Sequence, residues 1–456
     1  MADRQKHLGL FTDLYELTMA AAYFENQFTA KASFELFVRS LPRERSFLLT
    51  AGLEQALEYL ENVRFGEEEI EYLRRQPVFG HISDGFFDYL RDFRFTGEVW
   101  AVPEGTPVFG EEPLLRVTAP IIQAQVIETF LLSSLTFQTM IASKAARVVE
   151  AAERRNVVEF GSRRAHGPGA GLLAARAAYI GGCAGTSNVE AGRRFGIPVF
   201  GTMAHSFVMA YAKEEEAFQR FQQLFPEHGV LLIDTYDTLA AIDKIIQKKL
   251  HPTAVRLDSG DLLDLATRVR QKLDQAGLNQ TRIFASGDLN EFTIADLLAR
   301  GAPIDAFGVG TALATSKDAP TLGGVYKLVD LESETGIVYR AKFSEEKTTY
   351  PGPKQIFRFP DGAGTYRHDI IGRQSEKYSD AVGLLELVMR DGKRIAPSPC
   401  IEDIQKRASE ELKKIPATCR RLRDATPYPV MFSKELENLL ATVRQQTLKV
   451  AEAEYS

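Results

Sequence analysis

The sequence lacks several features that define whole classes of protein. It has only three cysteines, Cys183, Cys400 and Cys419, with no Cys-x-x-Cys pair among them, so we expect reduced thiols. Its first residues, MADRQKHLGLF, contain no long apolar core of the kind found in signal peptides. No uncharged apolar run approaches the roughly 20 residues that cross a bilayer. These absences predict a soluble, cytoplasmic protein.

Positive charge is not in excess either. The chain has 55 Lys and Arg against 61 Asp and Glu, which gives a net charge of -6. Proteins that bind nucleic acids or membrane surfaces usually carry a basic excess, so we expect neither partner. The spacings His-Glu-x-x-His, Gly-x-Ser-x-Gly and Gly-x4-Gly-Lys-Ser/Thr are also missing. Any use of ATP must therefore proceed without a P-loop.

The first third of the chain reads as a smaller α+β domain. A helical pattern near residues 14–24 precedes an alternating strand pattern at 31–38. Residues 50–95 are helical in pattern, and 97–118 are β-like with Pro and Gly at turn positions. A helix is expected over 120–152. We assign residues 1–135 to this domain and describe it as sandwich-like.

From residue 156 the pattern becomes a repeat of short β-rich runs followed by polar turns and helical stretches. The runs are VVEFGS (157–162), AYIGGC (178–183), PVFGTM (198–203), VLLIDTYD (230–237), AVRLDSGD (254–261), RIFASGD (282–288) and DAFGVG (305–310). Their spacing matches βα units and predicts an irregular βα barrel over residues 136–345. Residues 346–456 form a Gly-, Pro- and charge-rich extension that ends in a polar helix at about 432–453. The fold class is therefore α/β.

Polar residues stand where these runs end, which is where barrel enzymes place their catalytic groups. In FGSRRAHGPG, Arg163 can bind a phosphate or carboxylate, although a solvated basic loop would look the same. In RLDSGDL, Arg256 and Asp258 follow a strand, and carboxylates there can bind ribose hydroxyls or Mg²⁺. Helix capping is the alternative for the acidic residues, above all for Asp261.

Two further loops, FASGDLN and FGVGTAL, place Gly beside Ser or Thr between a strand and a helix. Backbone N–H groups in such loops bind phosphate, and the last strands of barrels often supply this site. His205, in GTMAHSF, lies just past a strand end. A lone histidine is more often structural, but beside a phosphate site an imidazole can act as a nucleophile toward a phosphoryl group.

Eight segments of the sequence, in the same order along the chain, resemble the nicotinate phosphoribosyltransferase family. They are TDLYELTMA (12–20), EFGSRRAHGPGA (159–170), GTSNV (185–189), GTMAHSF (201–207), VRLDSGDL (255–262), ASGDLNE (285–291), GVGTALATSKDAPTLGGVYKLV (308–329) and PGPKQIFR (351–358). The resemblance implies a type II phosphoribosyltransferase fold, namely a barrel plus a sandwich-like domain. It also implies a homodimer whose active sites are shared between subunits.

The resemblance also implies roles for individual residues. Tyr15, reaching from the partner subunit, and Phe160 would stack on the two faces of nicotinate, at roughly 0.5–1.5 kcal/mol per aromatic pair beyond area burial. Thr202 and Arg256 would hold nicotinate as well, and Asp258 the ribose. His205 would be the phosphorylated histidine. The residues implied to bind phosphoribosyl diphosphate are Arg163, Ser286, Gly287, Gly310 and Thr311.

Ser187, in the motif GTSNV, indicates whether the substrate is nicotinate or nicotinamide. The related nicotinamide enzyme carries an aspartate in the equivalent motif. An aspartate about 4 Å from the carboxylate of nicotinate would cost about 4 kcal/mol at an effective dielectric of about 20, or nearly three decades of affinity. A neutral Ser187 removes this repulsion, so the sequence favours nicotinate.

The implied reaction joins nicotinate to 5-phosphoribosyl 1-diphosphate, forms nicotinate mononucleotide and diphosphate, and is the first step of NAD salvage from nicotinic acid. The family couples this step to ATP hydrolysis, which places it in the ligase class, and Mg²⁺ is the expected cofactor. The alternatives are a nicotinamide or quinolinate phosphoribosyltransferase, an aldolase-type lyase and a non-catalytic homologue. None of the seven runs ends in the lysine that a Schiff-base lyase requires.

Overall fold

The computed structural model describes residues 7–153, 155–344 and 347–454, and these residues divide into two compact units. The first unit comprises Met1–Thr139, Thr321–Cys400 and Glu410–Ser456. The second comprises Met140–Pro320 and Ile401–Ser409. Two helices contribute residues to both units, α6 (Glu128–Ala151) and α15 (Ile401–Lys414). The sequence pattern does not predict helix α15, which lies within the extension expected over residues 346–456.

The first unit contains a seven-stranded sheet built around β1 (Lys31–Val38), which is buried at every position except Lys31. Strand β1 pairs in antiparallel fashion with β5 and β12 on its two sides, and the full order is β13-β12-β1-β5-β3-β17-β18. The other strands of this sheet are β3 (Glu98–Ala101), β5 (Pro113–Pro120), β12 (Gly324–Ser333), β13 (Gly336–Tyr339), β17 (Glu386–Arg390) and β18 (Lys393–Arg394).

Helices on the amino-terminal side complete the core of this unit. They are α1 (Leu14–Glu25), α2 (Leu53–Asn62), α3 (Glu67–Arg74), α4 (Asp84–Arg91) and α5 (Ile121–Val126), with short 3-10 turns at Leu8–Leu10 and Pro77–Phe79. Aromatic pairs such as Phe65 with Phe93, edge to face at 5.4 Å between ring centres, fill the space between them. The predicted helix near residues 14–24, strand at 31–38 and helix beginning near 120 are confirmed.

A second, four-stranded sheet in the same unit has the order β16-β14-β15-β19. Its strands are β14 (Lys354–Pro360), β15 (Tyr366–Arg373), β16 (Val382–Gly383) and β19 (Val430–Phe432). Two short strands, β2 (Leu48–Leu49) and β4 (Pro107–Val108), pair separately. The predicted polar helix near the carboxyl end is α16 (Lys434–Glu454), which contacts β15.

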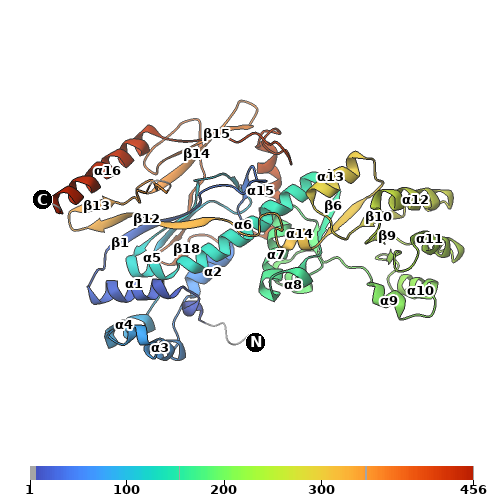
Figure 1. Cartoon of the computed structure of the whole chain (residues 1–456), viewed down its shortest axis with the longest axis horizontal. Coiled ribbons are helices and arrows are strands. Elements are labelled where there is room, and N and C mark those ends of the chain that lie inside the picture. Colours follow the sequence, from blue (N-terminus) through green and yellow to red (C-terminus); the bar gives the residue numbers. More distant parts are fainter. Residues whose placement is uncertain (1–6, 154, 345–346, 455–456) are drawn as a thin grey trace. The chain divides into compact units, whose positions relative to one another are not determined.

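The second unit holds a parallel sheet with the order β7-β6-β11-β10-β9-β8. Of these strands, β6, β9 and β10 are labelled in Figure 1. Its strands are β6 (Asn156–Glu159), β7 (Gly185–Thr186), β8 (Val230–Leu232), β9 (Ala254–Leu257), β10 (Arg282–Ala285) and β11 (Ala306–Val309). The ladder ends at β7 and β8 without joining them, so the predicted barrel is irregular. The fold-class prediction, α/β with a parallel βα arrangement, is confirmed.

Helices follow the strands in the predicted alternation. They are α7 (Pro168–Ile180), α8 (Val189–Phe195), α9 (His205–Met209), α10 (Glu214–Leu224), α11 (Thr238–Gln247), α12 (Leu262–Gln275), α13 (Glu291–Ala299) and α14 (Thr311–Ala314). Asp261 caps α12 by accepting hydrogen bonds from the amides of Leu263 and Asp264, both at 3.1 Å. Its side chain therefore takes the structural role that the sequence left open.

Two of the seven predicted strands are wrong, at residues 178–183 and 198–203. Residues 178–183 (AYIGGC) contain the end of helix α7, and the strand that follows is only the two residues of β7. A short apolar run fits a buried helix as well as a buried strand, and the alanine-rich sequence before Ile180 decides for helix. Residues 198–203 form no strand, and Val199 makes a single parallel bridge to Thr186.

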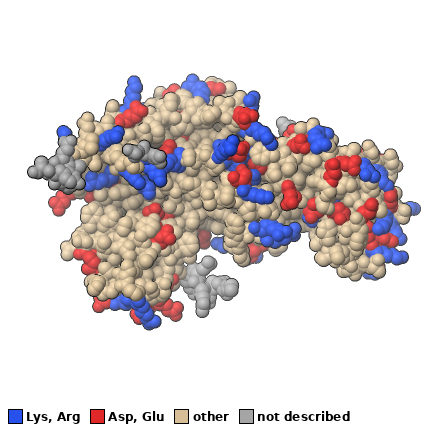
Figure 2. All heavy atoms as spheres, viewed as in Figure 1, with Lys and Arg blue, Asp and Glu red and all other residues tan. Residues whose placement is uncertain are grey.

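Three global observations complete the description. None of the helices within the described residues combines the length and the apolarity needed to cross a membrane. None of the three cysteines, all of which lie in the described part of the chain, forms a disulfide. On the face drawn in Figure 2, acidic and basic side chains are interspersed.

Candidate active site at the carboxyl ends of the parallel strands

The guanidinium group of Arg256 is the centre of a cluster of predicted site residues. Arg256 is the third residue of β9 and its side chain is 11% exposed. Its Nε donates to Ser286 Oγ at 2.8 Å, Nη1 to Thr202 Oγ1 at 3.0 Å and Nη2 to Asp258 Oδ1 at 2.6 Å. Because parallel strands end at one edge of their sheet, three separate loops meet on this one side chain.

An aromatic surface lies beside this cluster. The Arg256 Cζ atom is 5.6 Å from the centre of the Phe160 ring, and Phe160 in turn contacts Phe284 at 5.6 Å between ring centres. At Gly308 an added Cβ would lie 2.7 Å from Phe160, so glycine there leaves room for the ring. Phe160, Thr202 and Phe284 also line a cavity of about 130 Å³ within this unit. An aromatic acid placed against Phe160 could direct its carboxylate to Arg256.

Asp258 is ionised in this environment. Partial burial opposes its charge, but the hydrogen bond from Ser286 Oγ and the neighbouring Arg256 outweigh burial, so the pKa of Asp258 lies below its usual range. Its second oxygen, Oδ2, lies 3.9 Å from His205 Nε2. The carboxylate thus stands between the guanidinium and the imidazole.

His205 is the first residue of α9, and its side chain is 42% exposed. Its Nδ1 lies 3.1 Å from Thr235 Oγ1. This contact fixes the ring and leaves Nε2 on the side of Asp258. His205 and Arg256, which are 51 positions apart, therefore belong to one group of side chains.

The motifs in the sequence do not indicate Asp234, although it lies within the run VLLIDTYD, two residues after the end of β8. Its Oδ2 accepts hydrogen bonds from the Asp258 amide at 3.0 Å and from Ser259 Oγ at 2.7 Å. Its Oδ1 is buried and has no hydrogen-bond partner among the described residues. The rule that found Asp258, a polar residue at a strand end, would also have found Asp234 and Thr235.

The two glycine loops lie on neighbouring strands, since β10 pairs with β11. Gly287 has φ of 107°, and an added Cβ would lie 2.5 Å from the carbonyl oxygen of Asp258, so this position requires glycine. Gly310 precedes α14, whose first residue, Thr311, is exposed. An added Cβ at Gly161 would lie 2.8 Å from the Gly310 carbonyl oxygen. The FGSRR loop therefore packs directly on the second glycine loop.

Arg163 projects from the turn Ser162–Arg164 and is exposed. It forms no hydrogen bond or ion pair with other described residues, which leaves its guanidinium available to an anion. Ser187 is half-buried, and its amide donates to the Glu159 carbonyl at 2.9 Å. Tyr15 belongs to the first unit, on α1, and is 49% exposed. Its implied action on a partner's site stays a prediction.

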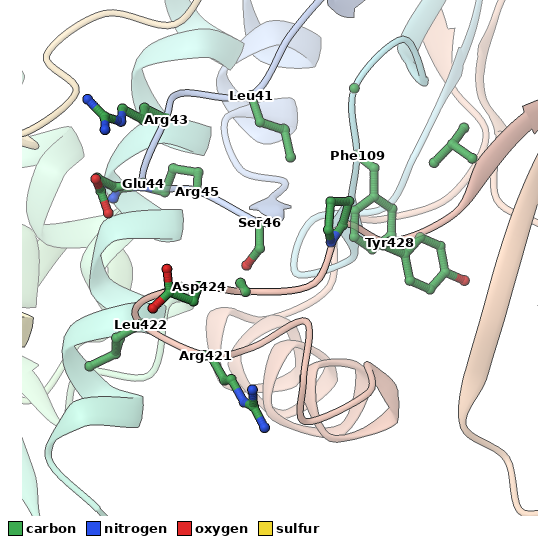
Figure 3. Close-up of a pocket in the computed structure, with 14 residues that line it drawn as sticks. Leu41, Arg43, Glu44, Arg45, Ser46, Phe109, Arg421, Leu422, Asp424 and Tyr428 are labelled. Carbon is green, nitrogen blue, oxygen red and sulfur yellow. The ribbon is translucent and has the colours of Figure 1, made fainter.

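A larger cavity, of about 560 Å³, lies in the first unit and includes none of the predicted site residues. Figure 3 shows the stacked rings of Phe109 and Tyr428 on one side of it and Glu44 and Asp424 on the other. The candidate active site is therefore distinguished by its chemistry and not by its size.

Comparisons with known proteins give the family. Family models match three stretches: the nicotinate phosphoribosyltransferase amino-terminal domain at residues 10–136, the quinolinate phosphoribosyltransferase carboxyl-terminal domain at 141–319 and the nicotinate phosphoribosyltransferase carboxyl-terminal domain at 373–440. A nicotinate phosphoribosyltransferase of Mycobacterium tuberculosis is 46% identical over 97% of this chain and 96% of its own. This chain belongs to the nicotinate phosphoribosyltransferase family.

Other relatives agree. The nicotinate phosphoribosyltransferase of Bacillus subtilis is 40% identical over 94% of this chain and 93% of its own. Among solved structures, human nicotinic acid phosphoribosyltransferase has a TM-score of 0.83 at 28% identity, covering 94% of this chain and 99% of the human one. Nicotinate-nucleotide pyrophosphorylase from Pyrococcus furiosus has a TM-score of 0.73 at 25% identity, covering 90% and 97%. The family predicted from the eight motifs is thus confirmed.

Proposed function

We propose that this member of the nicotinate phosphoribosyltransferase family transfers the phosphoribosyl group of 5-phosphoribosyl 1-diphosphate to nicotinate, in the first step of NAD salvage from nicotinic acid, and that it couples the transfer to ATP through His205. One observation carries the proposal. Arg256 joins, through three hydrogen bonds, the residues expected to bind nicotinate, ribose and phosphate, and Asp258 connects that group to His205.

Nicotinate is placed on Phe160 with its carboxylate at Arg256 and Thr202. The guanidinium fork matches a carboxylate, and the hydroxyls of Thr202 and Ser286 that now accept from it are neutral partners that a carboxylate can replace. Ser187 brings no charge to this site. Tyr15 of the partner subunit would stack on the face of nicotinate opposite Phe160, so the active protein would be a homodimer.

The ribosyl donor is placed on the glycine loops. Backbone N–H groups around Ser286, Gly287, Gly310 and Thr311 would bind the 5-phosphate, and the exposed Arg163 would bind the diphosphate. Asp258, held ionised, would accept hydrogen bonds from ribose hydroxyls. In the transfer, the pyridine nitrogen forms a bond to ribose C1 while the bond from C1 to the diphosphate oxygen breaks, and the bonding electrons leave with diphosphate.

Mg²⁺ is the proposed cofactor. Within the described residues, no group of three or more His, Cys, Asp or Glu side chains could hold a metal. Mg²⁺, however, is usually bound by one or two carboxylates together with substrate phosphates, and the unpartnered Asp234 Oδ1 and the neighbouring Asp258 fit that pattern. A bound Mg²⁺ would neutralise charge on the diphosphate.

Coupling to ATP is assigned to His205. With Nδ1–H donating to Thr235 Oγ1, the lone pair on Nε2 can attack the γ-phosphorus of ATP; the phosphoryl group moves to Nε2 and ADP leaves. Water later hydrolyses the phosphohistidine. The cycle drives product formation only if the two enzyme forms differ in their affinity for substrates and products.

The test is a product assay. Purified protein is incubated with nicotinate, phosphoribosyl diphosphate and Mg²⁺, with and without ATP, and chromatography follows nicotinate mononucleotide. Nicotinamide and quinolinate serve as competing acceptors, and turnover of either in preference to nicotinate would contradict the proposal. We expect His205→Ala to lose ATP stimulation while it retains slow transfer. His228→Ala, at an exposed histidine outside the cluster, is the matched control.

The proposed location is the cytoplasm, where the thiols of the three cysteines, which form no disulfide, would stay reduced.

A further inference from the structure

Two loops of the candidate site are tied to one buried carboxyl group, that of Glu159. Glu159 is the last residue of β6 and is completely buried. One oxygen, Oε1, accepts a hydrogen bond from the amide of Gly161 in the FGSRR loop. The other, Oε2, accepts from Thr186 Oγ1 at 2.6 Å. Glu159 belongs to the motif EFGSRRAHGPGA, but the motif alone indicates no role for it.

The connection continues through two more side chains. Thr186 Oγ1 accepts from the amide of Asn188 at 3.0 Å, and Asn188 Nδ2 donates to Ser162 Oγ at 3.0 Å. The path that begins at the Gly161 amide thus returns to Ser162, the next residue of the same loop. This path of hydrogen bonds passes through Thr186 and Asn188, and it thereby fixes the residues on both sides of Ser187. Glu159 is the last residue of β6 and Asn188 caps the amino terminus of α8, and both elements are labelled in Figure 1.

Packing alone does not account for a carboxyl group at this position. Burial raises the pKa of Glu159, and the hydrogen bonds from Thr186 and Gly161 act in the opposite direction. No ion pair with Glu159 is present among the described residues. Burying a carboxylate without a cation is unfavourable, whereas an apolar side chain would fill the same space without that cost. What the carboxylate contributes is two acceptors that point to different loops.

We infer that Glu159 is a positioning residue for substrate binding, which holds the FGSRR loop and the TSN segment in the geometry that nicotinate and the ribosyl donor require. The inference rests on the proposed function. Phe160 and Arg163 lie on the first loop and Ser187 on the second. An added Cβ at Gly161 would lie 2.2 Å from Ala314 Cβ. The first loop therefore cannot shift without disturbing the region after Gly310.

Glu159→Gln tests this inference with almost no change in volume. The glutamine side chain has one acceptor and one NH₂ group, so it can accept from Gly161 or from Thr186 but not from both. Because a buried donor then loses its partner, we expect the KM for nicotinate and the KM for phosphoribosyl diphosphate each to rise about tenfold. The kcat should change less, since Arg256, Asp258 and His205 belong to other strands or loops.

Substitutions at Thr186 provide the matched comparison. Thr186→Val removes the hydroxyl at nearly constant shape and should reproduce the rise in both KM values. Thr186→Ser keeps the hydroxyl and should behave as the unaltered protein. The double variant Glu159→Gln/Thr186→Val should have KM values no higher than those of the more affected single variant, because both substitutions break the same connection. Amide hydrogen exchange at Gly161 and Asn188 should rise in Glu159→Gln and Thr186→Val.

Glu214→Gln is the control for a merely structural effect, since Glu214 is also a buried carboxylate of the second unit and pairs with Lys244 at 2.9 Å. It should lower the thermal midpoint and leave both KM values unchanged. If Glu159→Gln behaves like Glu214→Gln, the positioning role is overturned. If the unaltered protein forms no nicotinate mononucleotide, the proposed function itself fails, and the positioning role for its substrates fails with it.

Discussion

Each unit contains an arginine bound to an aspartate, and the two pairs differ in what surrounds them. In the first unit, Arg358 is 1% exposed and donates Nε and Nη2 to Asp369, with Nη1 donating to the Pro107 carbonyl at 2.8 Å. Tyr428 donates a further hydrogen bond to Asp369 at 2.9 Å. In the second unit, Arg256 shares its donors between Asp258 and two hydroxyls, and Asp258 is 28% exposed.

This difference separates a pair that stabilises the fold from a pair that can bind a ligand. The partners of Arg358 are enclosed, and aromatic rings of Phe109 and Tyr366 lie within 5.5 Å of its guanidinium carbon. Water and small anions cannot reach it. Arg256 has hydroxyl partners that bind it more weakly than an incoming carboxylate would. The surroundings of an arginine, more than its ion pair, therefore indicate its role.

The largest effect is expected from Arg358→Ala. Removal of one partner of a buried ion pair leaves Asp369 without its cation, which costs about 3–5 kcal/mol. Urea unfolding should register this loss, while the KM for nicotinate in the remaining folded protein stays unchanged. A variant with unaltered unfolding free energy would remove the contrast between the two arginines.

Arg256→Ala should show the opposite pattern. We expect kcat/KM for nicotinate to fall about 100-fold, because a hydrogen-bonded charge contact to the carboxylate is worth about 1.5–3 kcal/mol. Steady-state kinetics measures this change in kcat/KM, and the free energy of unfolding measured in urea should change by about 1 kcal/mol or less. Arg256→Lys, which keeps the charge but loses the fork, should fall between the two proteins. Equal kcat/KM values in all three would contradict the assignment of the carboxylate.

The two units should also respond to pH with opposite sign. Glu16, in the first unit, is completely buried, and burial raises its pKa to about 7 despite hydrogen bonds from Thr12 and Thr129. Folding then favours the protonated acid. The contribution of Glu16 to the free energy of unfolding is fully present below the usual pH range of carboxyl titration. It is lost as the pH rises through about 7, and the loss amounts to up to about 3 kcal/mol.

Unfolding free energies measured from pH 5 to pH 8 test this expectation, and Glu16→Gln should flatten the decline. Asp258, with a lowered pKa, should contribute stability that is lost only as the pH falls below the usual aspartate range. Asp258→Asn should therefore alter the acid side of the profile alone. A decline that persists in Glu16→Gln would assign it to another group.

The smallest effect is expected at the half-buried Ser187. Ser187→Asp places a carboxylate near that of nicotinate, and we expect the preference for nicotinate over nicotinamide to fall about tenfold to 100-fold, less than the full Coulomb cost because water reaches the side chain. The measurement is the ratio of kcat/KM for nicotinate to kcat/KM for nicotinamide. Ser187→Asn, similar in size but neutral, is the control, and an equal shift in that variant would point to volume and not charge.

The sequence was sufficient to predict most of the site, because position along a βα repeat determines which edge of the sheet a residue reaches. Arg256 lies near the end of β9, Asp258 and Ser286 directly follow β9 and β10, and the three side chains converge. The strand proposed at 178–183 failed because local apolar composition does not distinguish a buried helix from a buried strand. The buried network of Arg358 was out of reach, since its contact with Pro107 joins positions 251 residues apart without any periodic pattern.

Glu159 shows a different limit. Its position at a strand end was visible, but its carboxyl group turns inward to bind an amide two residues away and a hydroxyl 27 residues away. Pattern alone cannot tell a group that contacts substrate from one that holds the loop behind it.

The interrupted ladder between β7 and β8 has an evolutionary consequence. Thr202 lies in residues 198–203, where one bridge at Val199 replaces a strand and an added Cβ at Gly201 would meet no atom within 4 Å. Insertions or exchanges in this stretch break few backbone hydrogen bonds. The contact proposed between Thr202 and the pyridine acceptor can therefore change during evolution without disturbing the remaining strands, on which the phosphate contacts are proposed.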